Sequence, residues 1–279
     1  MSLHLRHRNA MFLGHCVLRM SEWPASSVDL CVCDPPYNIG YDYHGEYADN
    51  LTPDAYKEFS RQWIGQVYEK LKPGGAFWLI IGDDWAADLQ VLAREIGFVR
   101  RKTVVWYFTF GVNQVANFTS SHTQLLYFVK PGAEPTFNAP DPACRVPSAR
   151  QLIYKDKRAN PLGRLPDDTW ILRPQDVPDG FAPTDDTWHI PRVAGTHKER
   201  QLAAPTQLPE QLVGRIIRLC SKLGELVLDP MCGMGTVPVV AKKLGRDYLG
   251  CDQAEKFVLA TNSRLSATTI GQPLAGDVM

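Results

Sequence analysis

Residues 28–38 read VDLCVCDPPYN, and this stretch decides how the rest of the chain is interpreted. Residues 28–33 are nearly all apolar, which is typical of a strand buried in a parallel sheet. The strand must end at the two prolines, because proline cannot donate a hydrogen bond to a neighbouring strand. The loop then presents the carboxylate of Asp34, a fixed backbone carbonyl and the ring of Tyr37. These groups are the ones needed to hold a flat, amino-bearing ring. A Pro-Pro turn in another kind of α/β enzyme is the alternative.

The composition indicates a globular protein that stays inside the cell. With 279 residues and 44% hydrophobic content, the chain can form one large α/β domain with an insert, or two smaller domains. The apolar run at 76–81 is too short to span a bilayer, and the first residues carry no apolar signal region. The seven cysteines lie mostly in apolar strand contexts and lack metal-ligand spacing. We therefore expect reduced cysteines, no metal, no membrane contact and a cytoplasmic location.

The charge is balanced over the whole chain but not along it. The formal net charge of zero argues against a strongly basic nucleic-acid module. Residues 141–164, however, hold six basic and two acidic side chains, a net charge of +4. Residues 165–190 hold six aspartates and one arginine, a net charge of −5. The sequence therefore predicts local patches of opposite sign.

The first 130 residues alternate between strand and helix patterns. Strands are predicted at 10–16, 28–33, 76–81, 98–108 and 124–129, and helices at 17–22, 53–71 and 85–96. Thr52 is the expected N-cap of the second helix, and Asp83 and Asp84 are expected to cap the third. The last two strands are expected to form an antiparallel edge pair of a mostly parallel sheet. The tyrosine-rich, glycine-punctuated segment 38–50 is interpreted as a loop over a site, although its single tyrosines fit a solvated loop equally well.

Residues 131–190 have a different character. Prolines recur throughout this segment and exclude long helices and central strands, so we predict a loop-rich insert. The insert carries the +4 patch. The sequence Asp-Asp-Thr-Trp occurs at 167–170 and again at 185–188. Two copies are too few for a repeat architecture, so we interpret both as local turns.

The α/β pattern returns near residue 209. A helix beginning there is followed by a strand at 225–229, a glycine loop at 230–236, a helix at 237–244, a strand at 248–252 and a closing helix at 257–265. Gly233 and Gly235 permit a close approach of the backbone to a ligand. Asp252, at the end of the second strand, is placed to bind a ribose diol. The loop lacks a third glycine and the Lys-Ser/Thr of a P-loop, which argues against nucleotide phosphates and leaves an NAD-type site as the alternative.

Three segments together resemble one enzyme family. DPPY at 34–37 resembles the catalytic motif of S-adenosylmethionine-dependent DNA amino-methyltransferases. LDPMCGMGT at 228–236 resembles their cofactor motif D-P-F-x-G-x-G-T, and APTQLP at 204–209 resembles the segment before the helix that packs beside the cofactor. The order of the motifs is that of the β group of the family, and the resemblance covers roughly residues 10–130 and 190–265.

The resemblance implies an α/β fold with a circularly permuted, Rossmann-like sheet that is mostly parallel and has an antiparallel edge. Residues 1–130 would form the catalytic half, 131–190 a target-recognition insert, and 191–279 the S-adenosylmethionine-binding half. The implied reaction is methylation of an exocyclic amine on a base flipped out of DNA. Adenine N6 is favoured, since cytosine-N4 enzymes more often have Ser at the position of Asp34. Alternatives are a cytosine-N4 enzyme, a methyltransferase acting on RNA or a protein amide, and a catalytically silent DNA-binding protein.

The resemblance also assigns roles to individual residues. Asp34 and the Pro35 carbonyl would accept the two amine N–H bonds, and Tyr37 would stack on the base. The implied catalytic set is Asp34, Pro35, Pro36 and Tyr37. The implied cofactor set is Asp34, His197, Lys198, Thr206, Gln207, Asp229, Pro230, Gly233, Gly235, Thr236 and Asp252. The residues expected to contact DNA phosphates are Arg150, Lys155, Lys157, Arg158 and Arg164.

Three positions depart from the family pattern. Met231 stands where Phe is usual, and Leu208 stands where Lys is common. His15 follows Gly14 at a position where many members have an acidic residue that contacts the cofactor adenine, so that contact is in doubt. Double-stranded DNA is the implied partner, and a homodimer and a cognate restriction endonuclease are further candidate partners.

Overall fold

The computed structural model describes residues 7–43, 45–108, 116, 120–145, 148–152, 154–165, 168–170, 193, 199–200 and 207–275. Three expected cofactor residues lie outside this part of the chain: His197, Lys198 and Thr206. The second Asp-Asp-Thr-Trp segment, 185–188, also lies outside it. Among the residues that the structure describes, no helix is both long and apolar enough to cross a bilayer.

The described residues form one eight-stranded sheet with the strand order β1-β8-β7-β2-β3-β5-β4-β6. Strands β1, β8, β7, β2 and β3 are parallel to one another, β5 is antiparallel to both β3 and β4, and β6 pairs parallel with β4. In sheet order the strands are β1 (Ala10–Leu13), β8 (Asp247–Asp252), β7 (Leu226–Asp229), β2 (Val28–Cys33), β3 (Leu71–Ile81), β5 (His122–Val129), β4 (Val99–Tyr107) and β6 (Thr169–Trp170). The predicted mostly parallel sheet and its antiparallel pair are confirmed.

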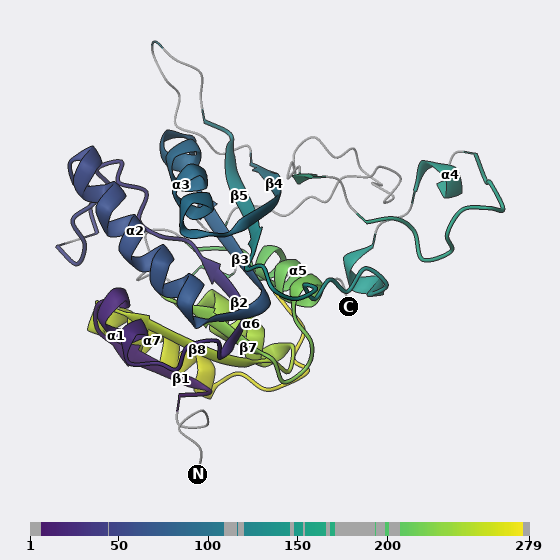
Figure 1. The fold of residues 1–279 in the computed structure, drawn as a ribbon. Coiled ribbons are helices and arrows are strands. Elements are labelled where there is room, and N and C mark those ends of the chain that lie inside the picture. The colour runs from purple at the N-terminus through teal and green to yellow at the C-terminus, as the bar shows by residue number, and fades with distance from the viewer. Residues whose placement is uncertain are drawn as a thin grey trace.

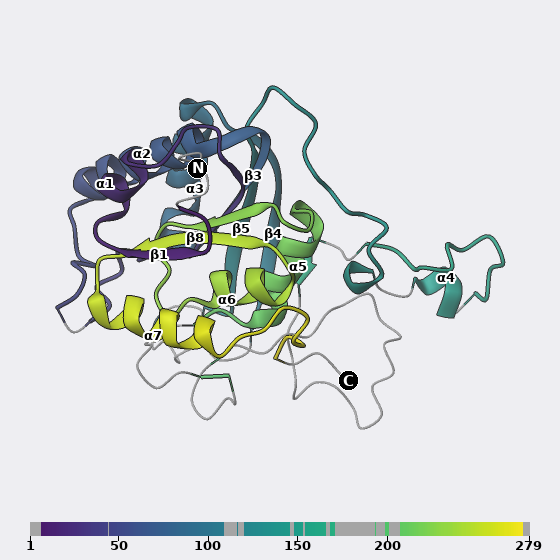
Figure 2. The same cartoon turned by 90° about the horizontal axis from the view of Figure 1, so that it is seen from below.

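Helices cover both faces of the sheet (Figures 1 and 2). One face carries α1 (Cys16–Ser21), α2 (Pro53–Lys70) and α3 (Asp83–Ile96), and the other carries α5 (Glu210–Cys220), α6 (Thr236–Lys243) and α7 (Glu255–Ser266). Each interface has its own apolar core. Trp63 packs edge-on against Phe77 in the first, and Ile216 and Val240 are fully buried in the second. This three-layer arrangement is the predicted Rossmann-like α/β fold.

The pairing of β2 with β7 brings the two halves of the sequence together. Leu30 faces Val227 and Cys31 faces Leu228 in a parallel ladder. Because parallel strands have their carboxyl ends at the same edge of a sheet, the loops after β2 and β7 are neighbours. The DPPY loop and the glycine loop therefore meet at this edge.

Thr52 confirms the predicted start of α2, because its side chain accepts a hydrogen bond of 3.3 Å from the backbone N–H of Ala55. The predicted capping by Asp83 and Asp84 is wrong, since Gly82 is the N-cap and makes no side-chain cap. Asp83 instead accepts a bond of 2.7 Å from Gln124 Nε2. Its carboxylate thus ties the start of α3 to β5.

Other boundaries also differ from the sequence-based prediction. β1 ends at Leu13 rather than at the expected 16, and Cys16 begins α1. β3 begins at Leu71, five residues before the expected 76, and its pairing with β2 shifts register between Val28 and Leu30. The shift lets the Pro-Gly-Gly segment 73–75 enter the strand. The described part of the first Asp-Asp-Thr-Trp segment, 168–170, is not the predicted turn: Thr169–Trp170 forms β6, and the carbonyl of Asp168 accepts from Val105 N at 2.6 Å. Local pattern cannot reveal a two-residue strand that exists only through its partner.

Apart from Thr169–Trp170, which joins the sheet as β6, the described residues of the insert between 139 and 165 lie away from the sheet (Figures 1 and 2). They contain a 3₁₀ turn at Pro142–Cys144 and the short helix α4 (Ala149–Leu152). The guanidinium of Arg145 donates to the carbonyls of Ala139 (2.5 Å) and Gly163 (2.7 Å). Arg145 therefore fastens the two ends of the loop that carries the other basic residues.

Candidate active site

One cavity lies at the carboxyl ends of the parallel strands. Asp34 follows β2, Asp229 ends β7 and Asp252 ends β8, and all three line this cavity. The structure brings together seven of the expected site residues in its wall: Asp34, Pro36, Gln207, Asp229, Gly233, Thr236 and Asp252. We refer to it as the central cavity. Residues from the two ends of the sequence thus form one site.

The DPPY loop is held by two tyrosine hydroxyls. Tyr37 Oη donates to Asp34 Oδ1 at 2.8 Å, and Tyr56 Oη donates to the carbonyl of Pro36 at 2.8 Å. The Tyr37 ring lies beside Gly82, where an added Cβ would be 3.2 Å from the ring. Pro35 and Tyr37 lie next to the central cavity rather than in its wall. The stacking role of Tyr37 stays a prediction.

The tyrosine-rich segment after the DPPY loop is anchored by Asp49, which is only 4% exposed. Its carboxylate accepts bonds from the backbone N–H groups of Asn38 (2.7 Å), Ile39 (3.1 Å) and Tyr41 (2.8 Å). Asn38 itself has a positive φ of 54° and exchanges two bonds with the backbone of Leu51. An asparagine tolerates this conformation better than most residues do. The segment is therefore folded over the site by specific contacts.

The glycine loop needs its glycines for two different reasons. Gly235 precedes α6 with φ 73°, and an added Cβ would lie 2.4 Å from Thr261 Cγ2. Gly233 has φ 47° and open space around it, and its N–H donates to Asp252 Oδ2 at 2.8 Å. Gly235 is thus required by packing, whereas Gly233 keeps the wall of the central cavity free of a side chain.

The central cavity concentrates negative charge. Burial raises the pKa of Asp229 well above its usual range, and the charges of Asp252 and Asp34 raise it further, against a bond from Met231 N–H. Burial likewise raises the pKa of Asp252. Three carboxyl groups around one partly enclosed space favour a positively charged ligand.

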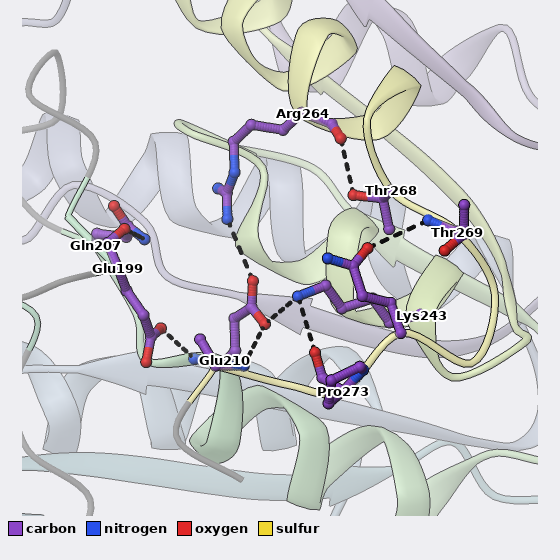
Figure 3. A network of polar contacts seen from close by, with 10 residues as sticks. Glu199, Gln207, Glu210, Lys243, Arg264, Thr268, Thr269 and Pro273 are labelled. Atoms are coloured by element: carbon purple, nitrogen blue, oxygen red, sulfur yellow. Dashed lines mark hydrogen bonds and ion pairs between the residues drawn. The ribbon is translucent and has the colours of Figure 1, made fainter. Parts of the chain in front are cut away.

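A buried polar network supports the cavity from behind (Figure 3). Glu210, at the start of α5, pairs with Lys243 at 2.7 Å, and the two side chains are 6% and 8% exposed. Arg264 lies 3.6 Å from the other oxygen of Glu210 and also donates to the carbonyl of Met234 in the glycine loop. One buried carboxylate therefore helps to hold this wall.

The same network reaches the opposite wall. Gln207 donates from Nε2 to the carbonyl of Glu199 at 2.9 Å, and the Glu199 carboxyl accepts from the N–H of Glu210 at 3.1 Å (Figure 3). Burial raises the pKa of Glu199 to about 7, opposed by the bond from Glu210 N–H. Sequence reasoning selected Gln207 but not its support, because a buried ion network has no local sequence signal.

Comparison with known proteins places this geometry in a family. A family model described as DNA methylase, of the N6/N4 type, matches residues 28–263. The chain is an S-adenosylmethionine-dependent DNA amino-methyltransferase of this family. It is 31% identical to the type II methyltransferase M.HpaI of Haemophilus parainfluenzae, over 92% of this chain and 74% of that protein.

Two other similarities extend the comparison. The methyltransferase is 28% identical to the DNA adenine methyltransferase YhdJ of Escherichia coli, over 92% of this chain and 82% of that protein. The crystal structure of the M1.HpyAVI–SAM complex has the same fold, with a TM-score of 0.61 and 17% identity, covering 91% of this chain and 98% of that one. S-adenosylmethionine is the cofactor of the methyltransferase.

The central cavity fits this cofactor chemically. S-adenosylmethionine carries a sulfonium and an α-ammonium group, and a nearby cation would offset the burial that raises the pKa of the Asp229 carboxyl. The glycine loop leaves room for backbone approach at Gly233. The residues present therefore match a nucleoside that carries cationic groups better than one that carries phosphates.

A second cavity adjoins the first. It is lined by His15, Phe59 and Gln253 among others, and it shares Pro36, Tyr47, Met231 and Asp252 with the central cavity. Pro230 also lines it. His15 lies edge-on to Phe59, with ring centroids 5.8 Å apart. The methyltransferase thus has a His in a cavity wall where the family pattern led us to expect an acid.

Sequence reasoning missed several apolar and aromatic wall residues. Tyr43, Tyr47, Met234 and Phe257 all line the central cavity. The cluster of tyrosines between the two prolines and α2 was a signal for Tyr43 and Tyr47, because aromatic loop residues often cover sites. Met234 and Phe257 had no such signal, since either could equally have belonged to the core.

The expected DNA-contacting residues lie on the projecting insert, away from the cavity wall. Arg150, Lys155 and Lys157 are exposed, and Arg164 is half-buried. Arg158 is 85% exposed and forms two bonds of 3.0 Å with Asp156, whose pKa is lowered by them. An exposed pair of this kind is weak and leaves the guanidinium available to a phosphate.

Proposed function

We propose that the methyltransferase transfers a methyl group from S-adenosylmethionine to the N6 amine of an adenine flipped out of DNA. The observation that carries the proposal is the placement of Asp34 in the same cavity as Asp229, Gly233 and Asp252. A methyl acceptor held at Asp34 would face a methyl donor held at the other three residues. Proximity of this kind accounts for a large part of the rate in group-transfer reactions.

The chain's own groups hold and orient the amine. An exocyclic amine is a weak nucleophile, because its lone pair is delocalised into the ring. Asp34 would accept one N–H and the Pro35 carbonyl the other, which favours a tetrahedral nitrogen whose lone pair points at the methyl carbon. S-adenosylmethionine supplies a methyl group on a positively charged sulfur, and that sulfur takes the electron pair of the broken C–S bond. The amine proton leaves after the N–C bond has formed, through Asp34 or water.

Other expected site residues are assigned to the cofactor. Gly233 and Thr236 would lie along the methionine part of the cofactor, and Asp229 would face its cationic groups. Asp252 would accept hydrogen bonds from the ribose hydroxyls. Gln207 would bind at the polar end from the opposite wall. His197, Lys198 and Thr206 are assigned to the same end on the basis of sequence alone.

Adenine is preferred to cytosine for two reasons. The motif begins with Asp34 rather than Ser, and one relative is named a DNA adenine methyltransferase. Both bases present an amine in similar geometry, so a cytosine-N4 activity is the second candidate, favoured by a family that spans N6 and N4 enzymes.

DNA would be held by the insert. Four of the five selected basic side chains are exposed on it, where phosphates can reach them. The exposed four are Arg150, Lys155, Lys157 and Arg158, and the fifth is Arg164. Because M.HpaI is named a type II methyltransferase, we extend the proposal to a cognate restriction endonuclease as partner.

The buried, unpaired state of all seven cysteines supports a reducing, cytoplasmic location. A homodimer stays a prediction that sedimentation would check.

The deciding experiment is methyl transfer from labelled S-adenosylmethionine to unmethylated genomic DNA, with the product digested to nucleosides and identified by mass. We expect N6-methyladenine. N4-methylcytosine would overturn the base assignment and keep the reaction type. Absence of any methylated nucleoside, with cofactor binding intact, would reject DNA methylation by this chain and turn the search to RNA or protein amides.

Asp34→Ala tests the catalytic assignment. We expect loss of turnover with binding of S-adenosylmethionine largely retained and binding of DNA retained, because Asp229, Gly233 and Asp252 of the cofactor set and the basic residues of the insert are unchanged. Tyr41→Phe is a matched control, since Tyr41 is 42% exposed and lines neither cavity. Turnover of Asp34→Ala at the rate of the control would refute the mechanism.

Lys157→Ala tests the phosphate contacts. Removing one contact should weaken DNA binding and lower the slope of log K against log salt by about 0.9. Lys222→Ala, which removes an exposed lysine between α5 and β7, is the matched control. An unchanged slope for Lys157→Ala would remove this residue from the phosphate-contact set.

A further inference from the structure

Tyr47 is one of the residues shared by the two cavities. Its side chain lines both of them, and its hydroxyl donates to Asp252 Oδ1. Burial and the neighbouring Asp252 charge raise the pKa of Tyr47, so the hydroxyl remains a donor at neutral pH. An adenosyl ligand that uses both cavities must pass the point at which this hydroxyl meets the carboxylate.

The acceptor positions of Asp252 are nearly filled. A carboxylate offers about four of them. Among the described residues, Gly233 N–H takes one at 2.8 Å, Ala254 N–H takes another at 2.9 Å, and Tyr47 takes a third. A ribose diol donates two hydroxyls. Both can be accepted only if one of the three present donors leaves, and the two backbone N–H groups are fixed at the glycine loop and at the start of α7.

The Tyr47 ring is held independently of its hydroxyl. It stacks on Phe257 with centroids 6.2 Å apart and an interplanar angle of 16°. The preceding residue, Glu46, accepts a bond of 2.6 Å from Gln253 Nε2 and pairs with Lys256 at 3.0 Å. Loss of the hydroxyl contact alone therefore leaves the local packing in place.

We infer that Tyr47 is an internal competitor for the ribose of S-adenosyl ligands: its hydroxyl takes an acceptor of Asp252 that the ribose diol needs, and it thereby lowers cofactor affinity. The inference rests on the proposed assignment of Asp252 to the ribose. It deepens that assignment by naming a residue, Tyr47, that would lower the affinity for the cofactor by competing with the ribose hydroxyls. The segment that carries Tyr47 is hydrogen-bonded to the DPPY loop through Asp49 and Asn38.

Two ligands and two variants test the inference. The ligands are S-adenosylhomocysteine and an analogue of it that lacks both ribose hydroxyls, with dissociation constants measured by calorimetry. Tyr47→Phe removes the hydroxyl and keeps the ring, and Tyr41→Phe is the control. We expect Tyr47→Phe to bind S-adenosylhomocysteine about tenfold more tightly than wild type, in line with a bond to a charged group. Affinity for the analogue should be the same in all three proteins.

The outcomes separate the inference from the proposed function. Weaker binding of S-adenosylhomocysteine by Tyr47→Phe would make Tyr47 a cofactor ligand and overturn the inference while sparing the site. Equal gains for both ligands would show that the ribose diol plays no part, and unchanged affinities would show no competition. Failure of wild type to bind S-adenosylhomocysteine at all would overturn the cofactor site together with the inference.

Discussion

Replacing Gly235 by alanine is the most informative single change in this protein, because it adds one methyl group at a point with no room for it. The new Cβ would lie 2.4 Å from Cγ2 and 2.6 Å from Oγ1 of Thr261. Thr261 is fully buried, and its hydroxyl donates to the carbonyl of Gly233 at 3.0 Å. Neither residue can move without disturbing the glycine loop.

The size of the effect follows from two terms. A non-glycine residue at φ 73° costs about 1 kcal/mol relative to glycine. Overpacking of a methyl group into a filled site costs about 1–3 kcal/mol more. We expect Gly235→Ala to lower the free energy of unfolding by about 3 kcal/mol. Gly233→Ala has a similar backbone conformation but meets no atom within 4 Å, so only the first term, about 1 kcal/mol, applies.

The assay is urea unfolding, followed by circular dichroism, together with cofactor binding by equilibrium dialysis. Gly235→Ala should lose stability, whereas Gly233→Ala should stay nearly as stable and lose cofactor affinity, since its methyl group enters the central cavity. Thr261→Ala should relieve part of the clash, so the double variant should be less destabilised than the sum of the single ones. Equal stability of Gly235→Ala and Gly233→Ala would refute the packing argument.

Three further changes have clear expected outcomes. Lys243→Met leaves the Glu210 carboxylate with only part of its partners and should cost about 3 kcal/mol of unfolding free energy, measured by urea titration. Burial raises the pKa of Glu199 to about 7, above its unfolded value, so ionisation of Glu199 destabilises the folded state as pH rises towards 7. Glu199→Gln should therefore raise the free energy of unfolding by about 1 kcal/mol at pH 8, after allowance for solvent screening, and leave it unchanged at pH 4. If Asp229 faces a cationic group of the cofactor as proposed, cofactor affinity should rise with pH by up to about tenfold per unit in wild type and less steeply in Asp229→Asn, which calorimetry across pH would show.

The parts of the site that sequence could predict are those fixed by strand ends. Asp34, Asp229 and Asp252 each follow an apolar run, and parallel strands bring such ends to one edge. The glycine positions were equally visible, since each breaks the pattern between a strand and a helix. Thr52 could be placed as a cap because the signal is confined to a few residues.

The remaining parts depend on contacts between distant segments. Tyr47 meets Asp252 across 205 positions, and Lys243 meets Glu210 across 33, so no local pattern encodes either pair. For Asp83 the local pattern was present but misleading. A carboxylate near a helix start is a common cap, but Asp83 accepts a hydrogen bond from Gln124 on β5 instead. β6 exists only because Val105 and Trp106 on β4 present an open edge to Thr169 and Trp170.

The position of β1 at the outer edge of the sheet has a consequence for synthesis. Ala10 pairs with Leu249, so β1 leaves the ribosome about 240 residues before its partner strand β8. At about 5–20 residues per second, that delay is roughly 10–50 s. During this interval the apolar strand β2 can pair with β3 on one side, but its partner on the other side, β7, has not yet been synthesised. Nascent chains of this enzyme should therefore recruit chaperones until the glycine-loop strand emerges, and a ribosome stalled in the insert should hold a chain prone to aggregate.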